Sequence, residues 1–245
     1  MYKDKHAKVK MMMVSKLQQY SGPLTSSEIA AGMNAATQNA KRLAKDARLL
    51  FENDRYASAL SLAILSIEES GKNHIFRELA LARNEKELRE CWRDYRSHTK
   101  KNVLWPIIDT FLKGARRAKD FLPLLEPNAE HPYLLDKMKQ ISTYTDCFKK
   151  GHWSIPEQII TKEVVQGFLM VADVLAHNRD ITTEEIDLWV QYLQPYWKTS
   201  NIDMQRALIE WDKKIRRRGL LGKDEKGTLE KFFTTGFGST GGREP

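Results

Sequence analysis

The sequence predicts an all-α protein, a bundle of amphipathic helices. Most segments between residues 25 and 218 repeat their apolar residues at the helical period of about 3.6. Two capping-box patterns mark helix starts, and neither a convincing alternating strand nor an Asn-Gly hairpin signal is present. The 245 residues can bury a substantial core, and a content of 41% hydrophobic and 29% charged residues is typical of a soluble globular chain.

The first half of the chain is expected to form four helices. Thr25 with Glu28 three residues later is a capping-box pattern that opens the first helix. The second helix is expected to continue through Gly71, since one helical glycine costs only about 1 kcal/mol relative to alanine. The four helices are expected at residues 29–53, 55–82, about 85–98 and 107–122.

The second half is expected to begin with a loop at residues 123–133, which are rich in helix breakers. Thr182 with Glu185 is a second capping-box pattern. The further elements expected are a helix at about 134–148, a turn at 149–156 and helices within 162–177, 183–198 and 203–218. The chain then divides into an N-terminal arm at 1–22, a helical domain at 23–200, a basic C-terminal helix at 201–222 and a flexible, glycine-rich tail at 223–245.

Two segments concentrate the net charge of +8. Residues 83–119 hold eleven Lys or Arg and five Asp or Glu, a net +6, and residues 206–223 hold seven and two, a net +5. Such blocks are typical of proteins that bind a polyanion such as RNA, because phosphate contacts supply most non-specific nucleic-acid affinity. The alternative is a pair of solvated helix faces that keep the protein soluble.

Several classes of protein lack support in the sequence. No apolar run approaches the roughly 18 residues of a membrane span, and no signal peptide is evident, so we expect a cytoplasmic protein. Cys91 and Cys147 form no CxxC motif and are expected to be reduced, partly buried thiols. Walker, dinucleotide-type, GxSxG and HExxH motifs are absent, and the histidines show no metal-ligand spacing, so no cofactor or metal is expected.

Glu68 lies where a helix of this kind should carry an apolar residue. On a wheel of about 100° per residue it falls inside the stripe formed by Ile64, Ile75 and Leu79. A carboxylate packed in this way needs a cation, hydrogen-bond donors or a proton, and Lys72 is the nearest candidate partner. Either Glu68 and Lys72 form a structural pair, or Glu68 reaches into a polar cleft and orients a catalytic group.

The rest of this helix has a second apolar flank and one polar face. Glu69 falls on the second apolar flank, between Leu62 and Phe76. The only clearly polar face is formed by Ser66, Ser70, Asn73 and Arg77.

Arg93 and His98, in the stretch RDYRSH, are candidates for acid–base chemistry on RNA. If the third helix stayed regular, His98 would fall about 140° from Arg93, so the two groups would not meet at one phosphate. Convergence requires either a helix that loosens near residue 98 or a second copy of the chain. Asp94 lies one turn before His98 and is expected to hold a ring nitrogen. A regular helix would also align a basic stripe, a possible phosphate track, of Arg89, Arg93, Arg96 and Lys100.

The chemistry that these groups would support is RNA cleavage without metal. A base takes the proton of a ribose 2′-hydroxyl, which attacks the adjacent phosphate while a cation stabilises the developing charge. Histidine suits proton transfer near neutral pH, and arginine suits bidentate contact with phosphate. The alternative is a partly buried histidine at a helix end.

Four stretches in order resemble the AbiV family of bacterial abortive-infection proteins, which belongs to the HEPN class of helical domains. They are NAKRLAKDARLL, RYASALSLAILSIEESGK, WRDYRSHTKKN and YTDCFKKGHWSIPEQIIT, within residues 27–180. The resemblance implies a HEPN-like helical bundle with additional C-terminal helices, pairing into a homodimer, and a role in phage defence. Many HEPN proteins are metal-independent RNases whose motif is matched by Arg93, Asp94 and His98, with the two copies facing each other across the dimer. Glu68 or Glu69 would support the pair.

The first functional hypothesis is therefore a dimeric endoribonuclease that arrests growth or translation on infection, with a phage-encoded activator protein as a candidate partner. Its catalytic residues would be Arg93, Asp94, His98 and Glu68, supported by Glu69 and Lys72, with Arg89, Arg96, Lys100 and Lys101 binding RNA. The second is a non-catalytic module that binds RNA, ribosomes or a phage protein through the basic blocks. A third, an adaptor for a protein partner, would use the tail and aromatic pairs such as Tyr196 and Trp197, for which core packing is the alternative.

Overall fold

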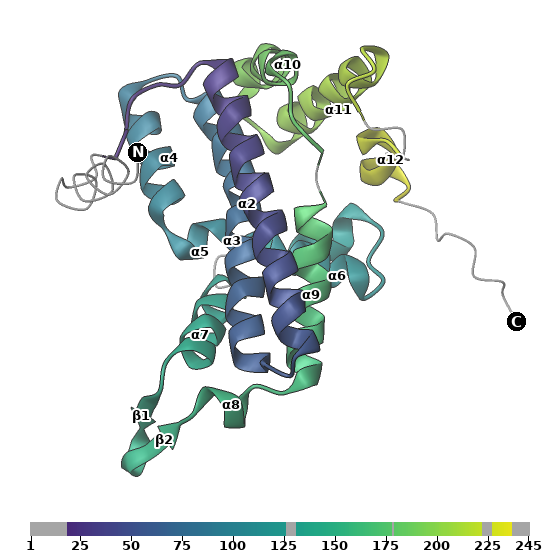
Figure 1. Cartoon of the computed structure of the whole chain (residues 1–245). Helices are drawn as coiled ribbons and strands as arrows, with labels where there is room; N and C mark the ends of the chain where they lie inside the picture. The colour runs from purple at the N-terminus through teal and green to yellow at the C-terminus, as the bar shows by residue number, and fades with distance from the viewer. Residues whose placement is uncertain (1–18, 126–130, 178, 222–226, 237–245) are drawn as a thin grey trace, which may run out of the picture.

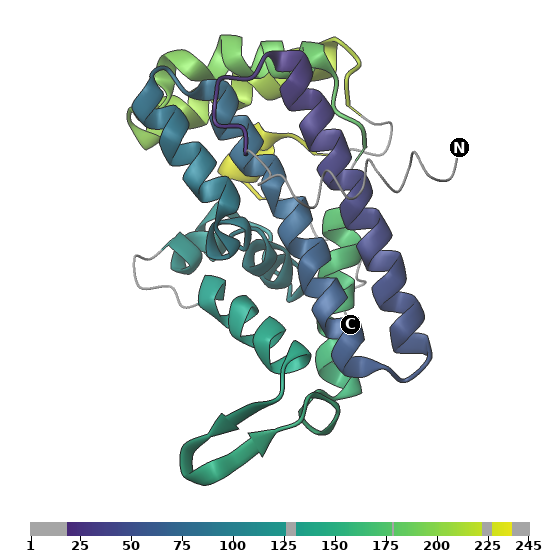
Figure 2. The same ribbon diagram turned by 60° about the vertical axis from the view of Figure 1, so that its left-hand side comes forward.

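The computed structural model describes residues 19–125, 131–177, 179–221 and 227–236. Two long antiparallel helices, α2 (Ser26–Glu52) and α3 (Tyr56–Leu81), form the centre of the bundle, and α9 (Lys162–Ala176) packs against both (Figures 1 and 2). Alanines fill much of the contact between these helices, which lets their backbones approach closely; they include Ala40, Ala44, Ala47, Ala59 and Ala63. The all-α fold class predicted from the sequence is confirmed.

The remaining elements surround this centre. α4 packs along the C-terminal half of α3, and α10 and α11 cover one end of the bundle (Figures 1 and 2). Their bounds are α4 Glu85–Arg96, α5 His98–Lys101, α6 Trp105–Leu112, η1 Ala118–Leu125, α7 His131–Thr143, β1 Asp146–Phe148, η2 Lys149–Gly151, β2 His152–Ser154, α8 Pro156–Ile159, α10 Thr183–Leu193, η3 Gln194–Tyr196, α11 Asn201–Arg217 and α12 Leu229–Thr234.

Both predicted capping boxes are confirmed. The hydroxyl of Thr25 accepts from the backbone N–H of Glu28 at 3.2 Å, and the Glu28 carboxylate accepts from the N–H of Thr25 at 2.8 Å. Thr182 and Glu185 make the same reciprocal contacts at the start of α10. Each box satisfies backbone donors that the first turn of a helix leaves without a partner.

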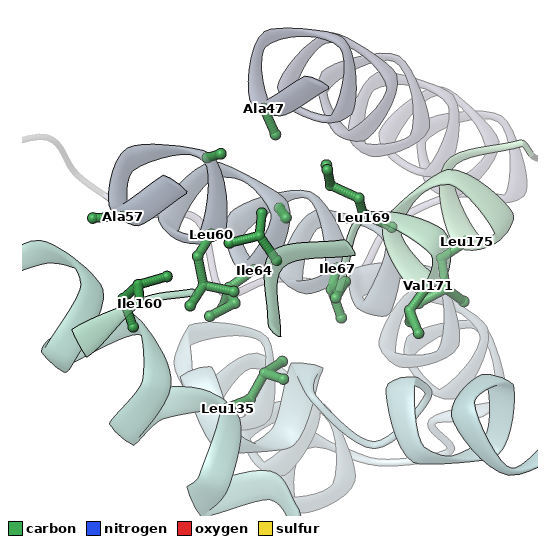
Figure 3. Packing of buried hydrophobic residues seen from close by; sticks show 14 residues of the cluster. Ala47, Ala57, Leu60, Ile64, Ile67, Leu135, Ile160, Leu169, Val171 and Leu175 are labelled. Carbon is green, nitrogen blue, oxygen red and sulfur yellow. The ribbon is translucent and has the colours of Figure 1, made fainter. Parts of the chain in front are cut away.

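The apolar stripe of α3 is the centre of the largest core cluster. Leu60, Ile64 and Ile67 are fully buried and contact side chains of neighbouring helices, including Leu135 from α7 and Leu169 from α9 (Figure 3). A second cluster joins the upper parts of α2 and α3 to α4, and a third joins α10 to α11. Trp197 packs partly buried against the third cluster, whereas Tyr196 is 46% exposed.

The polar face of α3 is not open to solvent. Ser66 donates to the carbonyl of Ala40 at 2.8 Å, and Asn73 donates to the hydroxyl of Thr37 at 3.0 Å. These bonds lie between α3 and α2, where they satisfy polar groups that close helix packing has buried.

Several regions differ from the elements expected, and the helix expected at 183–198 ends at Leu193. The fourth helix ends at Leu112, before Gly114 with its positive φ of 109°, and residues 118–125 continue as a 3-10 helix. The helix expected to reach residue 148 ends at Thr143, and a two-stranded hairpin, β1 and β2, follows it. Its residues alternate too briefly to show a strand pattern, and aromatic residues together with two positive-φ turn positions favour it. Residues 229–234, expected in a tail without helical structure, form α12 against α11.

Only parts of the two expected termini are described. Residues 1–18 and 237–245 lie outside the described ranges, as do residues 126–130 of the expected loop. Residues 20–22 lie against α4, where the indole of Trp92 donates to the carbonyl of Gly22 at 3.0 Å. Within the described ranges, none of the helices combines the length and the apolar character needed to cross a bilayer.

Candidate functional site

The site forms where α4 gives way to α5. Ser97 adopts an extended backbone (φ −85°, ψ 128°) that ends α4, and its hydroxyl caps the next turn by accepting from the N–H of Lys100. The chain therefore changes direction one residue before His98. The helix thus loosens near residue 98, the first of the two alternatives for convergence, and the break turns the imidazole toward α3.

Glu68 holds His98 in place. The carboxylate oxygen Oε2 lies 2.8 Å from Nδ1 of the imidazole. The Glu68 side chain is 3% exposed, as its place in the apolar stripe predicted, whereas the His98 side chain is 56% exposed. A buried anion thus fixes one edge of a ring whose other edge faces solvent.

Lys139 of α7 completes the cluster. Its ammonium lies 2.6 Å from Oε1 of Glu68 and 3.2 Å from Nδ1 of His98, and it also pairs with Asp136 at 3.4 Å. Of the two alternatives for Glu68, the structural pair with Lys72 is wrong, because Lys72 instead pairs with Glu69 at 2.6 Å. Lys139 was missed, although it shares a face of its helix with buried neighbours such as Leu135 and Ser142. The test that found Glu68, a charge on an apolar stripe, would have found its partner too.

The contacts of Glu68 determine which ring nitrogen of His98 carries the proton. A carboxylate only accepts hydrogen bonds, so a bond between Oε2 and Nδ1 places the proton on Nδ1. The Lys139 ammonium, which only donates, is then satisfied by Oε1 of the same carboxylate and by Asp136. Nε2 is the ring nitrogen not committed to Glu68, and in the neutral form of the imidazole it is then the acceptor.

Gly71 allows α5 to lie directly against α3. A Cβ placed on Gly71 would lie 1.9 Å from the carbonyl oxygen of Lys101, so no other residue fits without a backbone shift. Because Gly71 is three residues after Glu68, this close approach sets the distance between α5 and the carboxylate. A glycine tolerated in the middle of a helix is explained by packing at the site.

Lys101 is buried, with 8% of its surface exposed, which corrects the expectation that it contacts phosphate. Burial lowers the pKa of the Lys101 ammonium, and the Glu68 carboxylate partly offsets that effect. Lys101 thus adds positive charge behind the site and not on its surface.

Arg93 and Asp94 lie apart from the Glu68 cluster. The Arg93 side chain is 73% exposed and its Nε lies 3.5 Å from Asp94. Among the described residues neither of them contacts His98, so the expected Asp94–His98 bond is absent and Glu68 takes that place. Within one chain, the guanidinium and the imidazole are both accessible but remain separate.

The expected basic stripe is only partly present. Arg96 donates to the carbonyl of Tyr20 at 2.8 Å and stacks on the ring of Trp92, so its guanidinium anchors the segment before α2. Arg89 is exposed and pairs with Glu85, while Lys100 is exposed on α5, beyond the break. The helix break at Ser97 interrupts the row that a continuous helix would have formed.

Between α3 and α4, titratable groups that are buried or partly buried lie close to one another. Burial lowers the pKa of His74 and raises that of Glu78, and it raises the pKa of the Cys91 thiol to about 11. Cys91 is thus a buried thiol, as expected, whereas Cys147 is exposed. In the described ranges, no group of three or more His, Cys, Asp or Glu side chains is arranged to hold a metal ion.

A helical bundle that carries an arginine before a helix break and a histidine after it has the features expected of a HEPN-class domain. The family model described as AbiV, a HEPN family, matches residues 28–177, from the first turn of α2 to the end of α9. The chain therefore belongs to the AbiV family, and this membership supports an abortive-infection function of the HEPN type. No curated protein and no solved structure matched the chain. The match includes Glu68, Arg93, His98 and Lys139, whereas α10, α11 and α12 lie beyond it.

Proposed function

We propose that this protein defends bacteria against phage as a metal-independent endoribonuclease, which acts as a homodimer and arrests growth or translation on infection. The observation that carries the proposal is the His98–Glu68 contact of 2.8 Å between a half-exposed imidazole and a buried carboxylate. The contact fixes the ring by Nδ1 and leaves Nε2 uncommitted, and in the neutral imidazole Nε2 is the nitrogen that a general base uses.

In the proposed reaction, Nε2 of His98 takes the proton of a ribose 2′-hydroxyl. The 2′-oxygen forms a bond to the adjacent phosphorus, the bond from phosphorus to the 5′-oxygen breaks, and the imidazolium returns the proton to that oxygen. The products are a 2′,3′-cyclic phosphate and a 5′-hydroxyl. Glu68 keeps the imidazole in one orientation through both proton transfers, as the aspartate of a Ser-His-Asp catalytic triad does.

Arg93 would stabilise the charge that develops on the phosphate. An exposed guanidinium can contact two phosphate oxygens at once. Since Arg93 does not contact His98 within one chain, we propose that Arg93 of the second copy faces His98 of the first. Asp94 would then orient Arg93, with which it already makes contact. Arg89 and Lys100, both exposed, would bind flanking phosphates. The ion pair of Glu69 with Lys72 would stabilise α3 beside the site.

The proposal is tested by incubating purified protein with total RNA in the presence of a chelator and analysing the RNA ends. Wild-type protein should produce cyclic-phosphate ends, and His98→Ala should lower the cleavage rate by about 10²- to 10⁴-fold, the usual contribution of a general base. His177→Ala, which changes an exposed histidine at the end of α9, is the matched control and should cleave normally. A folded His98→Ala protein that cleaves RNA at the wild-type rate would falsify the proposal.

A second candidate is a non-catalytic module that blocks ribosomes or a phage protein. The observation that favours it is the basic end of α11, where Arg217 and Arg218 are exposed. Arg216, by contrast, pairs with the buried Asp212 at 2.9 Å, so reversing its charge would also disturb the packing of α11. The variant Arg217→Glu with Arg218→Glu should abolish protection under this candidate and leave RNA cleavage intact under the first.

A further inference from the structure

The β1–β2 hairpin extends away from the bundle beyond the end of α7 (Figures 1 and 2). Every residue from 143 to 153 is exposed. A two-stranded hairpin is at best marginally stable by itself in water, so one that stands out from the core contributes little to folding. Its side chains are available for a ligand.

The hairpin presents large aromatic side chains to solvent. Tyr144 is 60% exposed, Phe148 49% and Trp153 62%. Phe148 pairs with His152 across the strands, and Cys147 pairs with Trp153, so the two large strand rings lie on opposite faces. A hairpin that docks on a protein would be expected to gather its apolar side chains on one face. Rings on both faces instead suit a ligand whose separate flat groups can stack one by one.

The turn of the hairpin is basic. Lys149 and Lys150 form it with Gly151, and Asp146 is the only acidic residue of the strands and turn. The Asp146 carboxylate is occupied by the backbone N–H of Cys147 at 2.7 Å. Lys150 has a φ of 67°, a left-handed conformation in which glycine or asparagine is usual.

Aromatic rings interleaved with cations match the chemistry of single-stranded nucleic acid. Unpaired bases stack on exposed rings while lysines contact the phosphates, and duplexes hide the base faces that this mode needs. The hairpin is also continuous with the candidate site, because α7 carries Lys139 and leads directly into β1. From Lys139 to Phe148 the chain covers roughly 20 Å, taking about 1.5 Å per helical and 3.3 Å per extended residue, which one strand of several nucleotides can span.

We propose that the hairpin binds single-stranded RNA, stacking unpaired bases on Phe148 and Trp153 and contacting phosphates with Lys149 and Lys150. The inference deepens the proposed nuclease function by naming the substrate form and the surface that holds it. RNA held on the hairpin is presented to His98 in a form with accessible 2′-hydroxyls.

The test measures binding apart from cleavage. Full-length protein carrying His98→Ala is titrated into a fluorescein-labelled oligouridine of about 12 nucleotides, within the usual range for single-strand binding folds, and anisotropy gives the Kd. Phe148→Ala and Trp153→Ala should each weaken the Kd about tenfold, as expected for loss of one stacked base. The control Tyr196→Ala removes an exposed aromatic ring from η3 and should leave the Kd unchanged.

Two further variants separate binding from folding. Phe148→Ile with Trp153→Val keeps residues that favour strands while removing both rings, so it should bind more weakly than either single alanine variant. Lys150→Gly suits the left-handed turn position and removes one charge, so the slope of log Kd against log salt should fall by about 0.7.

Wild-type affinity in the Phe148→Ile, Trp153→Val variant would overturn the inference, as would a preference for duplex over single-stranded RNA. If these substitutions instead change the protein from dimer to monomer in size-exclusion chromatography without weakening RNA binding, the hairpin is a contact between two copies of the chain and the inference fails. The nuclease proposal is judged separately, by RNA cleavage with His98 intact. Hairpin variants that cleave saturating RNA normally but bind it weakly support both.

Discussion

Glu68 and Arg77 are charged residues of the same helix, α3, and the structure withdraws both charges from water in different ways. The Glu68 carboxylate bonds to His98 and Lys139, and the chain of contacts ends at an imidazole that is half exposed. The Arg77 guanidinium lies 4.7 Å and 5.3 Å from the ring centres of Trp189 and Trp211, so its contacts lead into the α10–α11 packing.

The difference shows how to tell a functional buried charge from a structural one. Burial lowers the pKa of Arg77 to about 10, which still leaves it charged at neutral pH, and its Nη1 has no hydrogen-bond partner in the described part of the chain. Stacking on two aromatic faces compensates the charge without creating a reactive group. Glu68, in contrast, contacts His98, a titratable group that a substrate can reach. The exposure of His98, and not the burial of the Glu68 charge, therefore indicates the functional site.

The comparison predicts its largest effect at Glu68. Glu68→Gln removes the charge that holds Nδ1–H of His98 and should lower RNA cleavage by about 10²- to 10⁴-fold, the range seen when a histidine base loses its orienting carboxylate. Cleavage rates at saturating RNA provide the measurement. Glu69→Gln, at the next position, changes a carboxylate that pairs with Lys72 and should cost far less activity. Equal losses in both variants would show that the His98 contact has no special role.

Arg77→Ala should act on stability and not on chemistry. Loss of the stacked side chain and the space it leaves should lower the free energy of unfolding by about 2–3 kcal/mol, read from the urea midpoint. Cleavage per folded molecule should stay at the wild-type level. Arg77→Met keeps most of the side-chain volume, so its free energy of unfolding should lie between those of the wild type and Arg77→Ala. If Arg77→Ala cleaves RNA poorly while fully folded, the division between the two charges is wrong.

Gly71→Ala should affect both stability and activity, since it moves α5 relative to Glu68. The clash with the Lys101 carbonyl involves backbone and cannot be relieved by a side-chain rotation, so we expect a loss of about 1–3 kcal/mol, typical of overpacking. Gly167→Ala is the control, because a Cβ there meets no atom within 4 Å, and it should stabilise α9 by up to about 1 kcal/mol. Normal activity in Gly71→Ala would mean that α5 tolerates displacement.

His74 should give the smallest effect, seen in the pH dependence of stability. Burial lowers its pKa below the ordinary value of 6.5, so the folded state resists protonation. Above pH 6.5, His74 is neutral in both states and does not make the free energy of unfolding depend on pH. As the pH drops from 6.5 through the lowered pKa of the folded state, the unfolded state takes up the proton first and the free energy of unfolding falls. Denaturant midpoints measured between pH 7.5 and about 5 should fall less steeply for His74→Gln. An unchanged slope in that variant would assign the acid sensitivity to other groups.

The local features of the fold were predictable because they depend on residues near one another in the sequence. The two capping boxes, the central helical hairpin and the burial of Glu68 follow from periods and spacings of three or four residues. The hairpin β1–β2 was not predictable in the same way. Its strands are three residues each, too short to show alternation, and its turn depends on a lysine in a conformation that propensity does not favour.

The sequence alone thus determined that the chain is helical, that Glu68 is a charge in an apolar stripe, and that the segment around Arg93 and His98 resembles a HEPN motif. The tertiary structure alone decided the partners of that charge. His98 is 30 residues and Lys139 71 residues from Glu68 along the chain, and both were preferred over Lys72, only four residues away. Helical spacing places Lys72 near Glu68. However, the packing of α5 at Gly71 and of α7 against α3 brings His98 and Lys139 to the carboxylate. A buried carboxylate must form hydrogen bonds, and these two groups are the donors beside it.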